Sequence, residues 1–432
     1  MIGITFHTTY VPRHRLPRAL IAAAWNTKAM PGAKAVAGFD EDSLTMAHAA
    51  LSARPAGMSA PDRVSFASTS SPYWQRSAAS QIAAALDLPS PVMTNDFGGS
   101  LRAGTSALIG AIDAVSSGNA ASVWVAAADQ RDGEPESTNE ILFGDAAAAI
   151  GIGAENVQAE FIAYASVNDD FPDEWRRSND LYVRGIASKY SQSRGYQANV
   201  DAAVKAVLAN AHLDPSQISL PPPVVPDIGN TGAAMPLLQL SHALNAAHPG
   251  DFILCAGHGD GADALLFRAT DAIAHSPLPT EKLLEHSSYS MYRKLRWWTH
   301  ETAGGAEISN VLWKLEQRQN IRLHGSRCLP CGAVSFPIAR VCPACRVANG
   351  QMEQALSRAG RVFTFTKDFL YDAPVQPTIM TVVDLDGGGR FLCQMTDTDV
   401  SAVAIGMTVE LVLRRMREGS QNHHYYWKCR PT

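Results

Sequence analysis

The sequence of 432 residues lacks an apolar run of the ~20 residues that a membrane-spanning helix needs. Its opening stretch, MIGITFHTTYVPRHRL, also lacks the apolar core of a secretory signal peptide. Charged side chains make up only 18% of the chain and the formal net charge is −5, so no basic excess points to nucleic acid. We therefore expect a cytoplasmic protein that binds neither a membrane nor nucleic acid.

Cysteine is scarce, with seven in the chain, but four of them form two Cys-x-x-Cys pairs within RCLPCGAVSFPIARVCPACR. These four are Cys328, Cys331, Cys342 and Cys345. Their spacing is typical of four thiolates around one tetrahedral ion, and it predicts a structural zinc site. Two disulfides or four free thiols are the alternatives, and reduced zinc-bound thiols fit the cytoplasm. Because four sulfur ligands leave no open coordination position, such a zinc would take no part in chemistry.

The chain is too long for one core of ordinary size, so we expect two or three domains. Short apolar runs alternate with helical patterns over residues 1–270, which favours a layered α/β domain. We interpret residues 271–305 as a connector and residues 306–350 as a short helix followed by a rubredoxin-like zinc ribbon. Five strand-like runs separated by Gly, Pro and Asp turns over residues 351–432 predict a small all-β barrel of the OB type.

Both halves of the chain resemble known families. The C-terminal part resembles the zinc-ribbon/OB-fold family that accompanies thiolase-type enzymes and helps to bind acyl-CoA, through SFPIARVCPAC, GRVFTFT and HHYYWKCRP. The N-terminal part resembles the thiolase superfamily, nearest to 3-hydroxy-3-methylglutaryl-CoA synthase and ketoacyl synthase III. Its matching pieces are, in chain order, YVPRHRL, EDSLTMA, SSPYW, RAGTSAL, FGDAAAA, DEWRR, IGNTGAA and GHGDGADALLF.

The resemblance implies a Claisen-type reaction, in which a cysteine thiolate takes the acyl group and a general acid/base assists the carbon–carbon step. Three of the family's catalytic groups have no counterpart in this chain. The cysteine position falls at Leu101 or its neighbours, and the glutamate position falls at Thr69. The interval 213–232, where the catalytic histidine should lie, is compressed and contains no histidine. Ser100 is an alternative nucleophile, although a serine in such a turn more often makes only turn hydrogen bonds.

Some polar residues of the family's active-site turns remain. The resemblance implies that Asn230 polarises a thioester carbonyl, and a plain turn residue is an equally good interpretation. His258 lies on a Gly-flanked turn after an apolar run and is our candidate acid/base. Arg102 could contact a phosphate of coenzyme A or pair with Asp96. Glycine-rich turns near both segments could supply N–H donors for an oxyanion. The other three cysteines lie in apolar or strand-like runs and are interpreted as core thiols: Cys255, Cys393 and Cys429.

These observations leave two hypotheses for function. The first is an enzyme that makes or cleaves a carbon–carbon bond of a CoA thioester without the usual cysteine nucleophile, by retro-aldol or retro-Claisen cleavage or acyl transfer. The alternative is a non-catalytic scaffold subunit that binds coenzyme A and assembles with an active thiolase. The resemblance also implies a homodimer formed through the sheet edge near the nucleophile helix.

Overall fold

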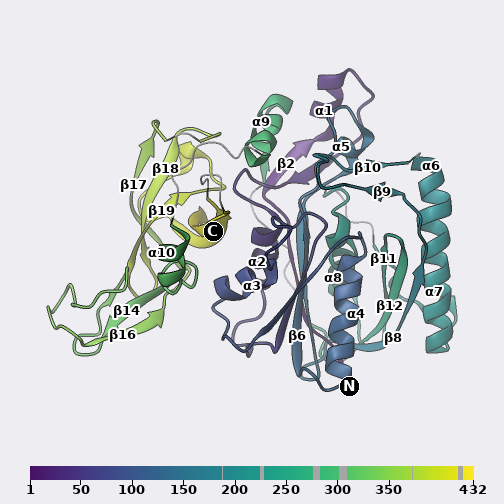
Figure 1. Cartoon of the computed structure of the whole chain (residues 1–432), viewed down its shortest axis with the longest axis horizontal. Helices are drawn as coiled ribbons and strands as arrows, with labels where there is room; N and C mark the ends of the chain where they lie inside the picture. The colour runs from purple at the N-terminus through teal and green to yellow at the C-terminus, as the bar shows by residue number, and fades with distance from the viewer. Residues whose placement is uncertain (187, 224–227, 276–282, 301–308, 372, 417–421) are drawn as a thin grey trace.

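The structure, a computed structural model, consists of a larger α/β body and a smaller body that contains the cysteine cluster and a barrel (Figure 1). The described residues are 1–186, 188–223, 228–275, 283–300, 309–371, 373–416 and 422–432. No helix among them is both long and apolar enough to cross a bilayer.

An eight-stranded sheet in the order β11-β12-β8-β1-β7-β6-β4-β5 forms the centre of the larger body. Its strands are β1 (Gly3–Tyr10), β4 (Arg63–Ala67), β5 (Met93–Phe97), β6 (Ser122–Asp129), β7 (Ala146–Gly153), β8 (Ala159–Asn168), β11 (Phe252–His258) and β12 (Gly261–Ala269). β4 is parallel to β5 and β6, and the other neighbouring strands are antiparallel. β1 and β8 pair only through their first residues, so the sheet folds over there into two layers of strands.

Helices enclose and separate the two layers of strands (Figure 1). These helices are α2 (Ser43–Ser52), α3 (Ala78–Ala85), α4 (Ala103–Ser116), α7 (Ala198–Ala211) and α8 (Met235–Ala246). Alternation along β6 shows how the layers form, because Trp124 and Ala126 face a core with α2 and α3 while Val123 and Val125 face another with α4 and α8. A third core joins α7 to the outer face of β8, β11 and β12. The result is the five-layered thiolase-like α/β fold.

Further elements cover the end of the sheets at which β4, β5, β6 and β11 finish. They are β2 (His14–Pro17), α1 (Arg18–Trp25), β3 (Ala33–Val36), α5 (Thr138–Leu142), β9 (Glu174–Trp175), β10 (Arg184–Gly185), α6 (Ser188–Tyr190), η1 (Ser191–Gln197), η3 (Gly232–Ala234), β13 (Leu284–Glu285) and α9 (Tyr289–His300). In α9, part of the expected connector, Tyr292 is buried in a small core with Leu16, Ile21 and Val36. The connector therefore packs on the larger body, as its aromatic residues predict.

The compressed interval 213–232 carries little regular structure in its described part. It contains η2 (Pro215–Gln217), the first residue of η3 and an isolated bridge between Leu220 and Ile253 of β11. At the edge of the sheet beside β11, where a full strand could run, a single residue, Leu220, pairs with β11.

In the smaller body a short helix is followed by a cysteine-bearing ribbon and an all-β barrel. Its elements are α10 (Asn310–Leu315), β14 (His324–Cys328), β15 (Val334–Ser335), β16 (Gln351–Ala355), β17 (Ala359–Asp368), β18 (Thr378–Leu385), β19 (Arg390–Met395), η4 (Val400–Ala402), β20 (Thr408–Arg415) and β21 (Tyr425–Pro431). The barrel closes in the order β17-β18-β19-β21-β20. Five strands closed in this way form the predicted OB-type barrel.

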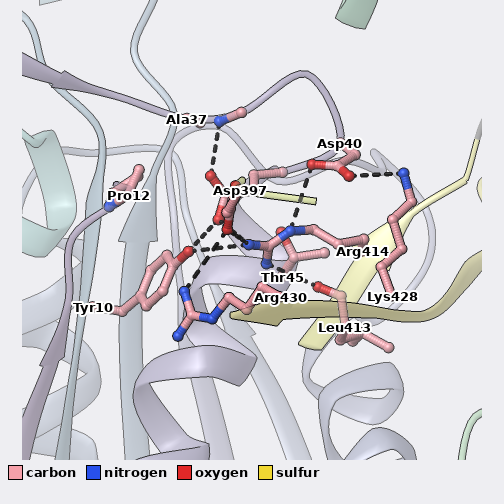
Figure 2. A network of polar contacts seen from close by, with 12 residues as sticks. Tyr10, Pro12, Ala37, Asp40, Thr45, Asp397, Leu413, Arg414, Lys428 and Arg430 are labelled. Carbon is pink, nitrogen blue, oxygen red and sulfur yellow. Dashed lines mark hydrogen bonds and ion pairs between the residues drawn. The ribbon is translucent and has the colours of Figure 1, made fainter. Parts of the chain in front are cut away.

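Buried charges join the barrel to the larger body (Figure 2). The guanidinium of Arg414 in β20 is fully buried and lies 2.6 Å from Asp397, 3.1 Å from Glu41 and 3.5 Å from Asp40. Lys428 of β21 lies 2.7 Å from the second carboxylate oxygen of Asp40. Asp40 and Glu41 lie just before Asp42, the N-cap residue of α2, so the turn that opens this helix also contacts the barrel.

Candidate functional site

The four paired cysteines form a compact cluster at β14 and the turns beside it. Their sulfur atoms all lie within 4.8 Å of one another, and two sulfur pairs are 3.5 and 3.7 Å apart. A tetrahedron with zinc–sulfur bonds of ~2.3 Å has edges of ~3.8 Å, so the cluster fits one tetrahedral metal ion. Cys328 and Cys342 are buried, and the N–H of Cys345 points at the sulfur of Cys342 over 3.5 Å.

The turn between β5 and α4 occupies the place where the resemblance puts the nucleophile. It contains Gly98, Gly99, Ser100, Leu101 and Arg102, so no thiol opens the helix. The hydroxyl of Ser100 is buried and has no hydrogen-bond partner among the described residues.

The turn after β11 rests directly on this α4 turn. A Cβ built on Gly259 would lie 2.7 Å from the Ser100 hydroxyl and 2.9 Å from the Leu101 nitrogen, so only glycine permits the approach. The N–H of Gly259 donates to the carbonyl of Gly261 over 2.9 Å. That amide is therefore already used and is not the expected oxyanion donor.

Cys255 lies nearest to these turns in sequence, but its thiol belongs to the core. Its side chain packs between β11 and α8, where the sulfur lies 3.6 Å from the carbonyl of Pro236. Burial raises the pKa of the Cys255 thiol to about 12, which keeps it protonated at neutral pH. Cys393 and Cys429 are likewise buried, in the barrel.

Asp129, at the end of β6, organises the turn that carries Thr69. Its fully buried carboxylate accepts hydrogen bonds from the hydroxyls of Ser68, Thr69 and Ser70 over 2.8–2.9 Å, and from two of their backbone amides. It also accepts the N–H of Ala233 over 2.8 Å. Thr69, where the resemblance puts the family's glutamate, is thus held by a neighbouring carboxylate and offers none of its own.

His258, the last residue of β11, forms a buried pair with Asp173. Its Nδ1 lies 3.3 Å from Oδ2 of Asp173, and both side chains are less than a tenth exposed. Burial lowers the pKa of His258, although Asp173 opposes this shift, and burial raises the pKa of Asp173. The imidazole is therefore neutral at pH 7. Its second nitrogen, Nε2, is buried without a partner among the described residues.

Arg131 forms a second buried group beside that pair. Its guanidinium lies 3.7 Å from the centre of the Phe143 ring and donates through Nη2 to Glu174. Neither Nε nor Nη1 has a partner among the described residues, although the side chain is only 2% exposed. Because Glu174 follows Asp173 in the chain, one dipeptide joins His258 to Arg131.

The same short segment contacts a third turn, since Arg176 donates to the carbonyl of Thr69 over 2.9 Å. Residues 173–176 therefore cover the turns after β4, β6 and β11 at once. This is the end of the sheets covered by β9 and β10 in Figure 1.

Asn230 is exposed and lies outside the buried part of the site. Its side chain is exposed, and its Oδ1 accepts the N–H of Gly232 over 3.0 Å. The neighbouring Thr231 hydroxyl is buried without a partner among the described residues. A Cβ on Gly232 would lie 3.0 Å from the side chain of Arg131. The Asn230 loop is thus next to Arg131, while His258 lies beside the α4 turn.

Arg102 turns away from this group of residues. Its Nη1 lies 3.5 Å from Asp263 and donates to the carbonyl of Val167 over 3.1 Å. Asp96 instead accepts the first N–H groups of α3, at Ala78 and Ala79. The expected alternative of an Arg102–Asp96 pair is therefore wrong.

Sequence reasoning missed three residues that define the site: Asp129, Arg131 and Asp173. Asp173 begins the DEWRR piece that carries part of the resemblance, so that motif was the available signal. Arg131 and Asp129 become visible only through packing, because their partners lie 43 to 104 residues away.

Comparisons with known proteins agree with this architecture. A family model described as "ChsH2, C-terminal OB-fold domain" matches residues 353–414. A hydroxymethylglutaryl-CoA synthase of Aeropyrum pernix is 32% identical over 342 residues, which cover 68% of this chain and 94% of the relative. A hydroxymethylglutaryl-CoA synthase of Thermococcus onnurineus is 29% identical over 338 residues, which cover 68% of this chain and 96% of the relative.

Solved structures show the same fold for the larger body. An HMG-CoA synthase complexed with CoA aligns with a TM-score of 0.63 at 16% identity, over 72% of this chain and 94% of that one. The 3-oxoacyl-(acyl carrier protein) synthase III of Pseudomonas aeruginosa aligns with a TM-score of 0.56 at 19% identity. The alignment covers 63% of this chain and 99% of that one.

Proposed function

The chain belongs to the hydroxymethylglutaryl-CoA synthase family, and from that premise we propose that it makes or cleaves a carbon–carbon bond of an acyl-CoA thioester without a cysteine nucleophile. Aldol cleavage, or its reverse, fits the site best because it needs an acid/base and charge stabilisation but forms no acyl-enzyme. The observation that carries the proposal is the buried His258–Asp173 pair beside the α4 turn, which contains no thiol where the resemblance puts the nucleophile, at Leu101 or its neighbours.

His258 would act as the general base. Asp173 is its positioning residue: when Nδ1–H is donated to Asp173, Nε2 carries the lone pair. That nitrogen is neutral at pH 7 and has no protein partner among the described residues. In aldol cleavage, Nε2 takes the proton of the substrate's β-hydroxyl and the Cα–Cβ bond breaks. The electron pair of that bond forms a thioester enolate, and Cβ leaves as a carbonyl compound. Protonation of the enolate at Cα then gives the shorter acyl-CoA.

Arg131 and Asn230 would stabilise the negative charge on the enolate oxygen. The Nε and Nη1 donors of the Arg131 guanidinium have no acceptor among the described residues, so they are available to an oxyanion. The Oδ1 of Asn230 is occupied by Gly232, which orients the amide so that Nδ2 can donate to a thioester carbonyl. Donors fixed in advance at the place where charge develops contribute strongly to such reactions.

The other predicted ligands and partners enter the proposal in supporting roles. Zinc at the cysteine cluster would hold the ribbon in place and take no part in chemistry. Arg102 stays a predicted contact for coenzyme A, with 20% of its side chain exposed beside Asp263. β5 ends the sheet and exposes half of Met93, so we propose a homodimer through this edge.

The test is cleavage of a panel of β-hydroxyacyl-CoA and β-ketoacyl-CoA thioesters by the chain alone, with products identified by mass spectrometry. We expect turnover that survives Cys255→Ser and is lost by two to four orders of magnitude in His258→Ala. His248→Ala is the matched control, because that imidazole is 87% exposed. Equal activity of the His258 variant and the control would contradict the assignment.

The alternative is a CoA-binding subunit without activity of its own. The resemblance leaves all three of the family's catalytic groups without a counterpart, with Leu101 or its neighbours and Thr69 at two of the positions, and this favours it. The cover of residues 173–176 over the site favours it as well. It predicts no turnover of any thioester by the chain alone and activity only with an added thiolase. It also predicts that His258→Ala leaves the activity of that assembly unchanged.

A further inference from the structure

A cleft of about 440 Å³ lies between the larger body and the body that contains the barrel. The end of α2 at Ser52, the segment 54–58 that follows it and residues 86–87 just after α3 line one side, and Arg322, Ala355, Leu356 and Arg358 line the other. α3 begins at Ala78, beside the end of β5, and runs ~12 Å away from the active-site end of the sheet to reach the cleft. The cleft is therefore separate from the site around His258.

Two arginines with similar surroundings, one from each body, line this cleft. The guanidinium of Arg54 lies 4.5 Å from the ring centre of Trp124, and that of Arg358 lies 4.4 Å from the ring centre of Trp427. Each also donates to a carbonyl in the last turn of a helix, Arg54 in α2 and Arg358 in α3. Stacking and these bonds hold both guanidiniums in place, and they use only part of the five N–H donors of each.

The charge of this pair is not balanced by carboxylates. Among the described residues, none places a carboxylate oxygen within 4.0 Å of Arg54 or Arg358. Asp87, the one acidic residue on the lining, is already 2.9 Å from Arg322 and 2.7 Å from His324. Burial, and then repulsion from Arg54, lower the pKa of Arg358 to about 10. The C-terminal dipoles of α2 and α3 offset a fraction of the excess.

We propose that this cleft binds a phosphorylated small molecule, whose phosphate is held between Arg54 and Arg358. Guanidiniums bind phosphate through paired N–H donors, and the hydroxyl of Ser52, 3.4 Å from Arg358, adds a third group. The apolar walls at Leu86 and Leu356 would take the organic part of the ligand. A volume of this size is in the range of small-ligand sites. Because both bodies supply the phosphate contacts, the ligand would strengthen their docking.

Two sources share this chemistry: the 3′-phosphate of a coenzyme A molecule and a free organic phosphate. Thermal unfolding and calorimetry of the full chain with five probes separate them. The probes are inorganic phosphate, adenosine 3′,5′-bisphosphate, coenzyme A, dephospho-coenzyme A and adenosine. We expect the bisphosphate to raise Tm by a few degrees at saturation, and adenosine to leave Tm unchanged. If coenzyme A binds more tightly than dephospho-coenzyme A, and Arg54→Gln abolishes this difference in affinity, the site belongs to coenzyme A. If the bisphosphate binds but coenzyme A and dephospho-coenzyme A bind equally, the site belongs to a free organic phosphate.

Variants make the test specific to the two arginines. Arg54→Gln should weaken binding of the bisphosphate at least tenfold, and Arg358→Lys, which keeps the charge, should weaken it less. Arg268→Gln on β12, an exposed arginine of the larger body, is the control and should bind as the unchanged chain does. Equal affinity of Arg54→Gln and the control, or no Tm rise with any phosphorylated probe, would overturn the proposal. Both outcomes are independent of whether the chain cleaves thioesters.

Discussion

Replacement of Arg414 by methionine should weaken the contact between the barrel and the larger body and lower the free energy of unfolding. The change keeps much of the side-chain volume but leaves the carboxylates of Asp40, Glu41 and Asp397 buried with one cation fewer. Removing one partner from a buried ion network costs ~3–5 kcal/mol, and Arg414 is fully buried with three acidic partners. We therefore expect the free energy of unfolding at pH 7 to fall by about that amount.

The pH dependence of this loss identifies its cause. Burial alone would raise the pKa of Asp397, but Arg414 and His14 hold the pKa well below its ordinary value. A depressed carboxyl pKa stabilises the fold above the unfolded pKa of ~3.9, and this contribution disappears as pH falls through the folded pKa. The difference between Arg414→Met and the unchanged chain should therefore stay near its full value from pH 7 down to about pH 4 and shrink only below pH ~3.9, as pH falls toward the folded pKa of Asp397.

Denaturant unfolding at several pH values measures the effect, and the barrel offers a matched control. Arg390 and Asp384 form an ion pair of 2.6 Å whose side chains are both about half exposed. Arg390→Met should leave the unfolding midpoint essentially unchanged, because exposed pairs contribute little. An equally small effect at Arg414, or a loss independent of pH, would refute the reasoning that buried charge complementarity holds the barrel.

Three further predictions concern the site, the metal and the fold. Because burial lowers the pKa of His258, its neutral form persists below pH 6.5, so the acidic limb of the kcat/KM profile should lie below that value; a limb at or above it would contradict the assignment. The chain should bind one zinc ion, and Cys342→Ser should lose it and loosen the ribbon, as elemental analysis and limited proteolysis would show. Gly104→Ala should destabilise the larger body by ~1–3 kcal/mol, since its Cβ would lie 2.3 Å from a backbone oxygen, whereas Gly110→Ala in the same helix meets only ordinary contacts and should be neutral.

The sequence was sufficient to predict the fold because its strongest signals are local. The knuckle spacing predicts four sulfurs at one point, and the order of short strands and turns predicts the barrel. The continuous apolar run along β6, with Trp124 facing one core and Val125 the other, shows in the sequence that helices cover both sides. The docking of the barrel was not predictable, because Arg414 and Asp40 look like ordinary surface charges until the two bodies meet.

The site was only partly predictable for a related reason. His258 stands out because it follows a strand and is flanked by glycines, and the structure places it against the α4 turn. Its partner Asp173 comes from a segment 85 residues away, and nothing in local spacing joins the two. Arg131 would read as a surface residue in sequence, yet it is buried under Phe143 and Glu174. When distant segments of the chain bury a charged side chain, local sequence patterns do not reveal that burial.

Adding a thiol and a carboxylate at the positions where the resemblance puts them should not produce a synthase. The double change Leu101→Cys and Thr69→Glu returns a thiol and a carboxylate to the expected positions, but the second position is no longer built for an acid. The hydroxyl of Thr69 lies 2.8 Å from the carboxylate of Asp129, which is fully buried and already accepts bonds from the neighbouring serines. A glutamate there would place a second carboxylate beside the first, and two such charges cannot both stay ionised at short range. We expect one of two results for this double variant. Either mass spectrometry detects no acyl-enzyme after incubation with acetyl-CoA, or the variant loses stability unless Asp129 is also replaced by asparagine. Stable acylation by the double variant alone would show that the turn is a dormant synthase site and not one rebuilt around Asp129.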